Sequence, residues 1–164
     1  MNSADFKNGE YGDVPPKKGL QAFFRVYSTW ALSPEWFRQE CWKDVGCKTL
    51  QEYLNQNWDG GGEANDLLAL LWTWQHGDVT RYFPEDAGDL AKTLGRVKAR
   101  CLIVPVSTDQ YFPPEDSEQE VKALKDGILR VVPSVWGHLA GGGNGTKEDT
   151  EFMVREIGEF LKLR

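Results

Sequence analysis

The chain has 164 residues, of which 40% are hydrophobic and 27% are charged, a balance typical of one globular domain. Its formal net charge of −6 disfavours binding to nucleic acid or to an anionic membrane surface, because both attract basic proteins. No apolar run approaches the roughly 20 residues of a transmembrane helix, and the first residues lack the apolar core of a secretory signal.

Three cysteines occur, Cys41, Cys47 and Cys101, and no pair of them has C-x-x-C spacing. An odd number without that spacing favours reduced thiols, and hence a cytoplasmic protein. With only two histidines available to join these cysteines, we expect neither a metal site nor a cofactor.

The first half of the chain is polar at its start and then helical. Residues 1–19 are rich in Gly, Pro and Lys and predict a flexible N-terminal segment. Residues 20–82 predict a helical lid or cap region with four helices. They are expected over residues 21–32, from the Ser33-Pro34 N-cap, from the capping box Thr49/Glu52, and from Glu63 to the stop at Gly77. Gly60-Gly61-Gly62 is interpreted as a linker.

Residues 83–164 predict an α/β core. Leu90, Leu94 and Val97 share one helical face, which we expect to pack on a sheet. The apolar run 101–106 is typical of a strand buried on both faces, and 128–132 is a second strand. Between them, Ser117 and Glu120 form a capping box for a helix that Gly127 ends. Thr146 and Asp149 form another box, which opens the closing helix.

A strand, a crossover helix and a second strand form a parallel pair, so the carboxyl ends of both strands lie at one edge of the sheet. Asp109 follows the first strand and His138 follows the second. An Asp that orients a His, and a His that takes a proton from a nucleophile, are the acid and base of a Ser–His–Asp triad. Open α/β sheets place their ligands at this edge.

Simpler interpretations exist for several of these residues. Asp109 could instead cap a turn, as Asp often does. Trp136 could contact a substrate or belong to the core. His76 is expected at a helix C-terminus, where a cation suits the dipole. The Gly-rich segment 141–145 lacks the order of a phosphate-binding loop and is expected to be a flexible loop beside His138.

The segments STDQYFPPED and PSVWGHLAGG carry a family resemblance. The chain resembles the α/β-hydrolase superfamily, in its homoserine O-acetyltransferase-like branch, over the lid and the C-terminal half only. The resemblance implies an α/β fold class: the C-terminal part of an α/β-hydrolase fold, a short parallel sheet with flanking helices, plus a helical lid. It also implies that Asp109 is the triad acid and His138 the base, with acetyl-CoA as an acyl donor substrate.

Two departures from that family shape the predicted function. Authentic acetyltransferases carry an Asp directly after the catalytic His, where this chain has Leu139, so ester hydrolysis is an alternative. No G-x-S-x-G elbow precedes Asp109, so the chain contains no triad nucleophile and is predicted to be a fragment that is inactive on its own. A different alternative is a non-catalytic interaction module completed by a partner chain.

The predicted partners are small molecules. We expect an ester, a thioester or a hydroxyl acceptor as substrate, and a homodimer or a partner subunit to cover the open edge of the short sheet. The remaining interpretation is a truncated gene product without a stable fold, because a sheet of only a few strands buries little apolar surface.

Overall fold

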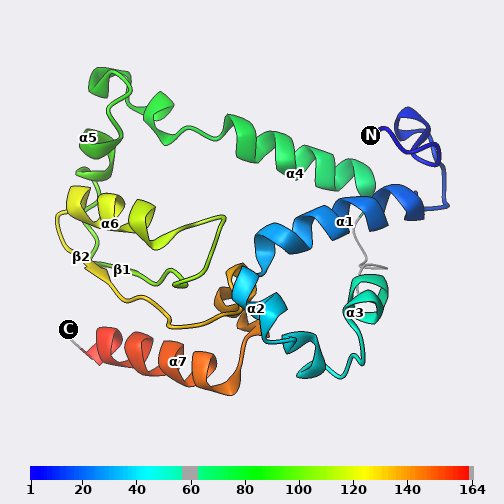
Figure 1. Ribbon diagram of the computed structural model, residues 1–164. Helices are drawn as coiled ribbons and strands as arrows, with labels where there is room; N and C mark the ends of the chain where they lie inside the picture. Colours follow the sequence, from blue (N-terminus) through cyan, green and yellow to red (C-terminus); the bar gives the residue numbers. More distant parts are fainter. Residues whose placement is uncertain (57–62, 163–164) are drawn as a thin grey trace. The chain divides into compact units, whose positions relative to one another are not determined.

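A computed structural model describes residues 1–56 and 63–162 of the chain (Figure 1). The predicted linker Gly60-Gly61-Gly62 lies outside the described residues. Internal contacts divide the chain into two compact units. The first comprises residues 1–29 and 37–77, and the second comprises residues 30–36 and 78–164. The predicted three-part division at residues 19 and 82 stays a prediction.

The first unit is helical, as its sequence predicts. It holds most of α1 (Lys17–Ala31), together with α3 (Leu50–Gln56) and α4 (Ala64–His76), and a short 3-10 helix at Cys41–Lys43. The predicted capping contact of α3 is present, because the Glu52 N–H donates to Thr49 Oγ1 at 3.1 Å. Gly77 follows the last residue of α4, as expected.

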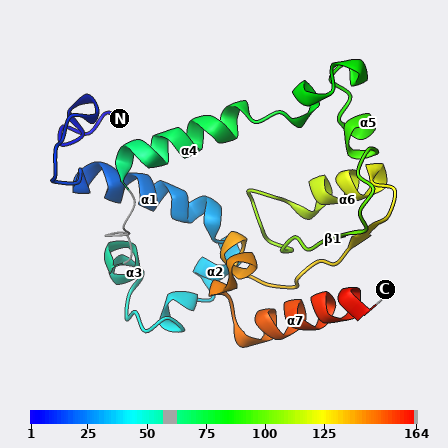
Figure 2. The same ribbon diagram turned by 180° about the vertical axis from the view of Figure 1, so that it is seen from behind.

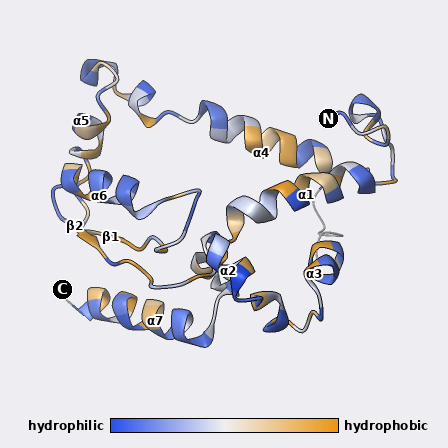
Figure 3. Ribbon diagram, viewed as in Figure 1, coloured by the Kyte–Doolittle hydropathy of each residue, from blue (hydrophilic) through white to orange (hydrophobic). Residues whose placement is uncertain are grey.

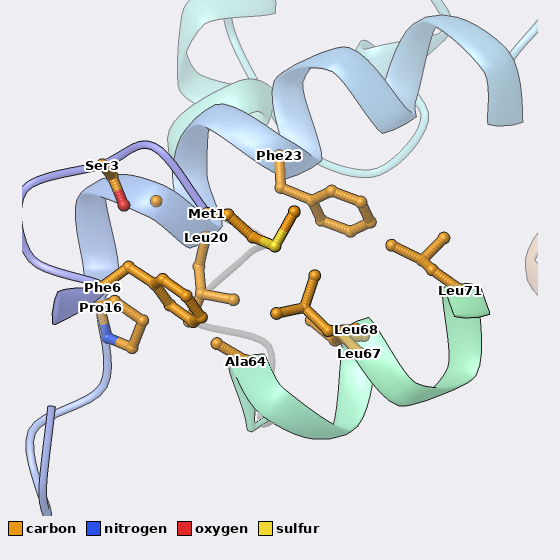
Figure 4. A pocket seen from close by; sticks show the side chains of 11 residues that line it. Met1, Ser3, Phe6, Pro16, Leu20, Phe23, Ala64, Leu67, Leu68 and Leu71 are labelled. Carbon is orange, nitrogen blue, oxygen red and sulfur yellow. The ribbon is translucent and has the colours of Figure 1, made fainter. Parts of the chain in front are cut away.

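Apolar side chains of α1 and α4 converge around a cavity of about 70 Å³ (Figure 4). Leu20 and Phe23 come from α1, and Leu67, Leu68 and Leu71 come from α4. The start of the chain adds Met1 and Phe6, and Phe6 is only 7% exposed. Phe6 therefore contributes to the apolar core of this unit, whereas Met1 is 80% exposed. The predicted flexibility of residues 1–19 stays a prediction.

The second unit contains the sheet. Its elements are most of α2 (Pro34–Arg38), α5 (Leu90–Leu94), β1 (Cys101–Ile103), α6 (Pro114–Ala123), β2 (Gly127–Leu129) and α7 (Lys147–Lys162). The strands are parallel, with Leu102 opposite Ile128. Helices α6 and α7 lie on opposite sides of this strand pair in both views (Figures 1 and 2). This is the predicted strand–helix–strand crossover.

The strands are shorter and less buried than the apolar runs predict. Pro105 interrupts the first run because it has no N–H to donate to the ladder. Pairing resumes at one isolated bridge, between Val106 and Val132. These two valines are 2% and 0% exposed, whereas all residues of β1 and β2 are half-buried. The predicted burial of whole strands on both faces is therefore wrong for the sheet that the described residues form.

Two of the helix N-terminal caps described next agree with the prediction, and one does not. Ser33 Oγ accepts the Trp36 N–H at 3.0 Å and caps α2, as predicted. The box at α7 is confirmed by two reciprocal bonds between Thr146 and Asp149, of 2.8 and 3.2 Å. The box predicted at Ser117 is wrong. Helix α6 begins earlier, at Pro114, because a proline is well placed in a first helical turn.

Two further features complete the second unit. Helix α5 packs chiefly against α6, and Leu90 is 47% exposed, so the predicted packing of Leu90 on the sheet is wrong. Figure 3 shows apolar colour along the strands, whereas α6 is mainly hydrophilic, as expected for a helix at the surface.

Within residues 1–56 and 63–162, no helix combines the length and apolarity needed to cross a membrane.

Candidate active site

The structure brings Asp109 and His138 together. His138 Nδ1 lies 3.0 Å from Asp109 Oδ2, although the two residues are 29 positions apart in the sequence. The parallel register explains this contact. The Val106–Val132 bridge aligns the strand extensions, and Asp109 and His138 each follow one of them toward the same edge of the sheet. The predicted juxtaposition is therefore observed, while its catalytic use stays a proposal.

The Asp109 carboxylate is held by its own loop. Its side chain is 6% exposed, and Oδ1 accepts the backbone N–H groups of Tyr111 and Phe112 at 2.8 and 3.2 Å. An Asp that binds backbone N–H groups two and three residues ahead stabilises a turn. The turn-capping role and the contact with His138 thus coexist, because each uses a different carboxylate oxygen.

This contact determines which nitrogen of His138 carries the proton. A carboxylate oxygen only accepts hydrogen bonds, so the neutral imidazole donates from Nδ1. Nε2 is then left as an acceptor. A His oriented in this way can take a proton from a hydroxyl that approaches Nε2. The His138 side chain is 28% exposed, and among the described residues no hydroxyl forms a hydrogen bond with its ring.

Two aromatic rings that are not among the predicted site residues contact His138. The ring of Tyr111 meets the imidazole edge-on at 4.9 Å between centroids, and the ring of Phe112 lies at 5.4 Å. Trp30, at the end of α1, lies 6.4 Å from Tyr111. Tyr111 and Phe112 follow Asp109 directly, so their position in the acid loop was the one signal that could have identified them.

The loop before His138 is anchored to distant parts of the second unit. Ser33 Oγ donates to the Val135 carbonyl at 2.5 Å across 102 positions of sequence. Ser134 Oγ donates to the buried Asp149 carboxylate at 2.8 Å. Thr108 Oγ1 contacts both Ser134 and Gly137. None of these contacts has a pattern in the sequence that would have predicted it.

The other predicted site residue, Trp136, is buried. The residue is 5% exposed, and its ring meets Trp36 edge-on at 5.8 Å between centroids. This position favours the core alternative, while contact with a substrate stays a prediction. His76 lies at the C-terminal end of α4, as expected, with Nδ1 2.7 Å from the Trp72 carbonyl oxygen.

The acidic and thiol groups of the described part form no metal centre. Within residues 1–56 and 63–162, no three His, Cys, Asp or Glu side chains gather so that they could hold an ion. The 3.0 Å contact between His138 and Asp109 is the arrangement of described titratable side chains on which we base a chemical proposal.

Comparison with known proteins finds relatives that match most of this chain. The chain is 35% identical to a probable esterase of Corynebacterium glutamicum, over 96% of this chain and 44% of that protein. It is 35% identical to an ethyl acetate hydrolase of Pseudomonas veronii, over 74% of this chain and 35% of that protein. A homoserine O-succinyltransferase of Hahella chejuensis is 28% identical over 83% of this chain and 40% of that protein.

A solved structure agrees with these relatives. An acetylester hydrolase from Corynebacterium glutamicum superposes with a TM-score of 0.87 at 30% identity, covering 96% of this chain and 45% of that one. The chain spans less than half the length of the curated relatives it matches. No protein-family model matches it. The sequence similarity and the shared fold together identify the chain as a member of the α/β-hydrolase superfamily, in the branch of esterases and homoserine O-acyltransferases, and as part of that fold.

Proposed function

We propose that this chain supplies the acid and the base of a Ser–His–Asp triad that hydrolyses small esters. The observation that carries the proposal is the 3.0 Å contact between His138 Nδ1 and Asp109 Oδ2 at the carboxyl edge of two parallel strands. The serine and the oxyanion donors would come from polypeptide outside these 164 residues, since no G-x-S-x-G elbow occurs in the sequence.

The proposed reaction uses Nε2 of His138 twice. The serine hydroxyl gives its proton to Nε2 as its oxygen attacks the ester carbonyl, and Asp109 stabilises the imidazolium that forms. His138 then returns the proton to the departing alkoxide, which leaves an acyl-serine. Water then attacks the acyl-serine while Nε2 accepts its proton, and His138 passes that proton to the serine oxygen as the carboxylic acid leaves.

Two observations favour ester hydrolysis over acyl transfer to homoserine. The esterase relatives are 35% identical to the chain, whereas the acyltransferase from Hahella chejuensis is 28% identical. Leu139 also stands where the acetyltransferase resemblance implies an Asp after the catalytic His. An acyl-CoA thioester as donor, with a hydroxyl acceptor, is the competing reaction.

A segment exchange tests the proposal. The matched segment of the Corynebacterium glutamicum esterase is replaced by this chain, so that the rest of that esterase supplies any serine and oxyanion donors. We expect the chimera to hydrolyse ethyl acetate. Asp109→Asn should lower kcat by about 10⁴-fold, because the His loses its tautomer. His138→Ala should lower it by about 10⁶-fold.

Controls separate chemistry from folding. His76→Ala changes the only other histidine that this chain contributes to the chimera and should leave turnover unchanged. Circular dichroism should show the same fold for all variants. A folded chimera whose turnover survives His138→Ala would refute the base role. Formation of O-acetylhomoserine from acetyl-CoA, in place of free acetate, would favour acyl transfer.

A further inference from the structure

One hydroxyl links the acid loop to the loop that carries His138. Thr108 Oγ1 donates to the Ser134 carbonyl oxygen at 2.7 Å and accepts the Gly137 N–H at 3.1 Å. A threonine hydroxyl has a single hydrogen, so its one donor bond goes to this loop. Thr108 directly precedes Asp109, and Gly137 directly precedes His138. The hydroxyl therefore joins the two residues that lead into the acid–base pair.

This link continues the sheet beyond its last backbone pairing. The Ser107 N–H donates to the Val132 carbonyl oxygen at 2.9 Å, next to the Val106–Val132 bridge. One residue further, the Thr108 side chain makes the connection in place of the backbone. We propose that Thr108 is a positioning residue that fixes the His138 ring against Asp109, an inference that rests on the acid–base roles proposed above.

The two bonds of Thr108 differ in what their loss would do. The Ser134 carbonyl also accepts the Ser107 hydroxyl at 3.2 Å, so it keeps a partner when Thr108 Oγ1 is removed. The Gly137 N–H has Thr108 Oγ1 as its hydrogen-bond acceptor among the described residues. Removal of the hydroxyl therefore releases the backbone of Gly137, directly beside His138, while the rest of the loop keeps its anchors at Ser33 and Asp149.

The test uses the 164-residue chain and does not depend on turnover. Two-bond ¹H–¹⁵N correlation spectra at pH 8 report which ring nitrogen of His138 is protonated. In the wild type we expect the Nδ1–H form, because Asp109 accepts that proton. Thr108→Val keeps the shape of the side chain and removes the hydroxyl, and we expect it to lose the Nδ1–H preference. Thr108→Ser restores the hydroxyl and should restore the wild-type spectrum.

Two control variants accompany this test, one expected to change the spectrum and one expected to leave it unchanged. Asp109→Asn removes the proton acceptor and should also lose the preference. Thr150→Val makes the same chemical change at an exposed threonine of α7, whose hydroxyl donates to the Thr146 carbonyl oxygen just before that helix, and should leave the His138 spectrum unchanged.

Each outcome separates the positioning role from the acid–base proposal. A folded Thr108→Val that keeps the Nδ1–H form overturns the positioning role and leaves the acid–base pair intact. Loss of the native near-ultraviolet signal in both Thr108→Val and Thr108→Ala also overturns it, because the hydroxyl would then serve folding. A wild type without any Nδ1–H preference overturns both proposals. Loss in Thr108→Val with rescue in Thr108→Ser supports positioning, whether or not the chimera hydrolyses esters.

Discussion

Gly137 shows how one residue determines the position of the next. Its φ of +55° lies in the left-handed region, which residues with a Cβ atom rarely adopt. A Cβ at this position would lie 2.6 Å from the Ala31 carbonyl oxygen, at the end of α1. The His138 loop therefore needs glycine both for its backbone turn and for its close approach to a segment about a hundred residues earlier.

We expect Gly137→Ala to lower the free energy of unfolding by about 1–3 kcal/mol, through the strained φ and the close contact. Urea denaturation of the whole chain measures the loss. Gly46→Ala separates the two causes, since Gly46 has a φ of +83° but open space around it. Gly158→Ala lies within α7 in open space and should be neutral or stabilising by about 0.5–1 kcal/mol. Equal stability of Gly137→Ala and wild type would show that the loop tolerates a Cβ.

At the scale of elements, an ion pair between buried Asp86 and half-exposed Arg96 ties the 3-10 turn Pro84–Asp86 to α5. Asp86 is 5% exposed, and its two carboxylate oxygens accept bonds of 2.7 Å each from the Arg96 guanidinium. Thr93 Oγ1 adds a third bond at 3.0 Å. The hydrogen bonds from Arg96 hold the pKa of the Asp86 carboxyl below its ordinary value. This pair positions α5 against the turn that leads into it.

The lowered pKa predicts a pH-dependent stability with a definite sign. A carboxyl whose pKa is lower in the folded state stabilises the fold above its ordinary value of about 3.9. That stabilisation is lost as the pH falls through the ordinary value toward the lowered one, because the unfolded chain then binds more protons. We expect the Tm to fall as the pH drops below about 4, and Asp86→Asn to lower the Tm at pH 7 and to weaken this decline.

Thermal unfolding between pH 2.5 and pH 7 gives the comparison. Glu118→Gln changes an exposed carboxyl on α6 and should keep the wild-type profile. A wild-type profile in Asp86→Asn would show that other carboxyls cause the acid sensitivity.

Most of the helices and the topology of the sheet followed from the sequence. The spacing of Leu67, Leu68 and Leu71 predicts α4, and two apolar runs around a helix predict parallel strands. Strand length did not follow, because Pro105 interrupts a run whose composition is uniformly apolar. The start of α6 did not follow either, since Ser117 and Glu120 have the spacing of a capping box but lie inside the helix.

At the scale of the whole molecule, the chain contains the Asp and the His that we propose as two members of a triad, and its sequence has no G-x-S-x-G elbow for the third. Its 164 residues cover 44% of the Corynebacterium glutamicum esterase. We therefore expect a fluorophosphonate probe to label no serine of the isolated chain, because a fast reaction needs a serine hydroxyl activated by His138. Intact mass spectrometry detects the adduct, and the esterase chimera is the positive control. A labelled serine within this chain would show that it carries its own nucleophile.

Sequence alone determined that Asp109 and His138 would meet. Both follow apolar runs joined by a helix, and a right-handed crossover leaves few other arrangements. It could not determine what holds them in place. Thr108, Gly137 and Ser33 act through contacts across 26 to 102 positions, and such contacts depend on how loops pack rather than on local spacing. Only the tertiary structure places Nδ1 of His138 opposite the Asp109 carboxylate. We infer from this contact that Nδ1 donates, because the tautomer depends on which atom lies opposite it.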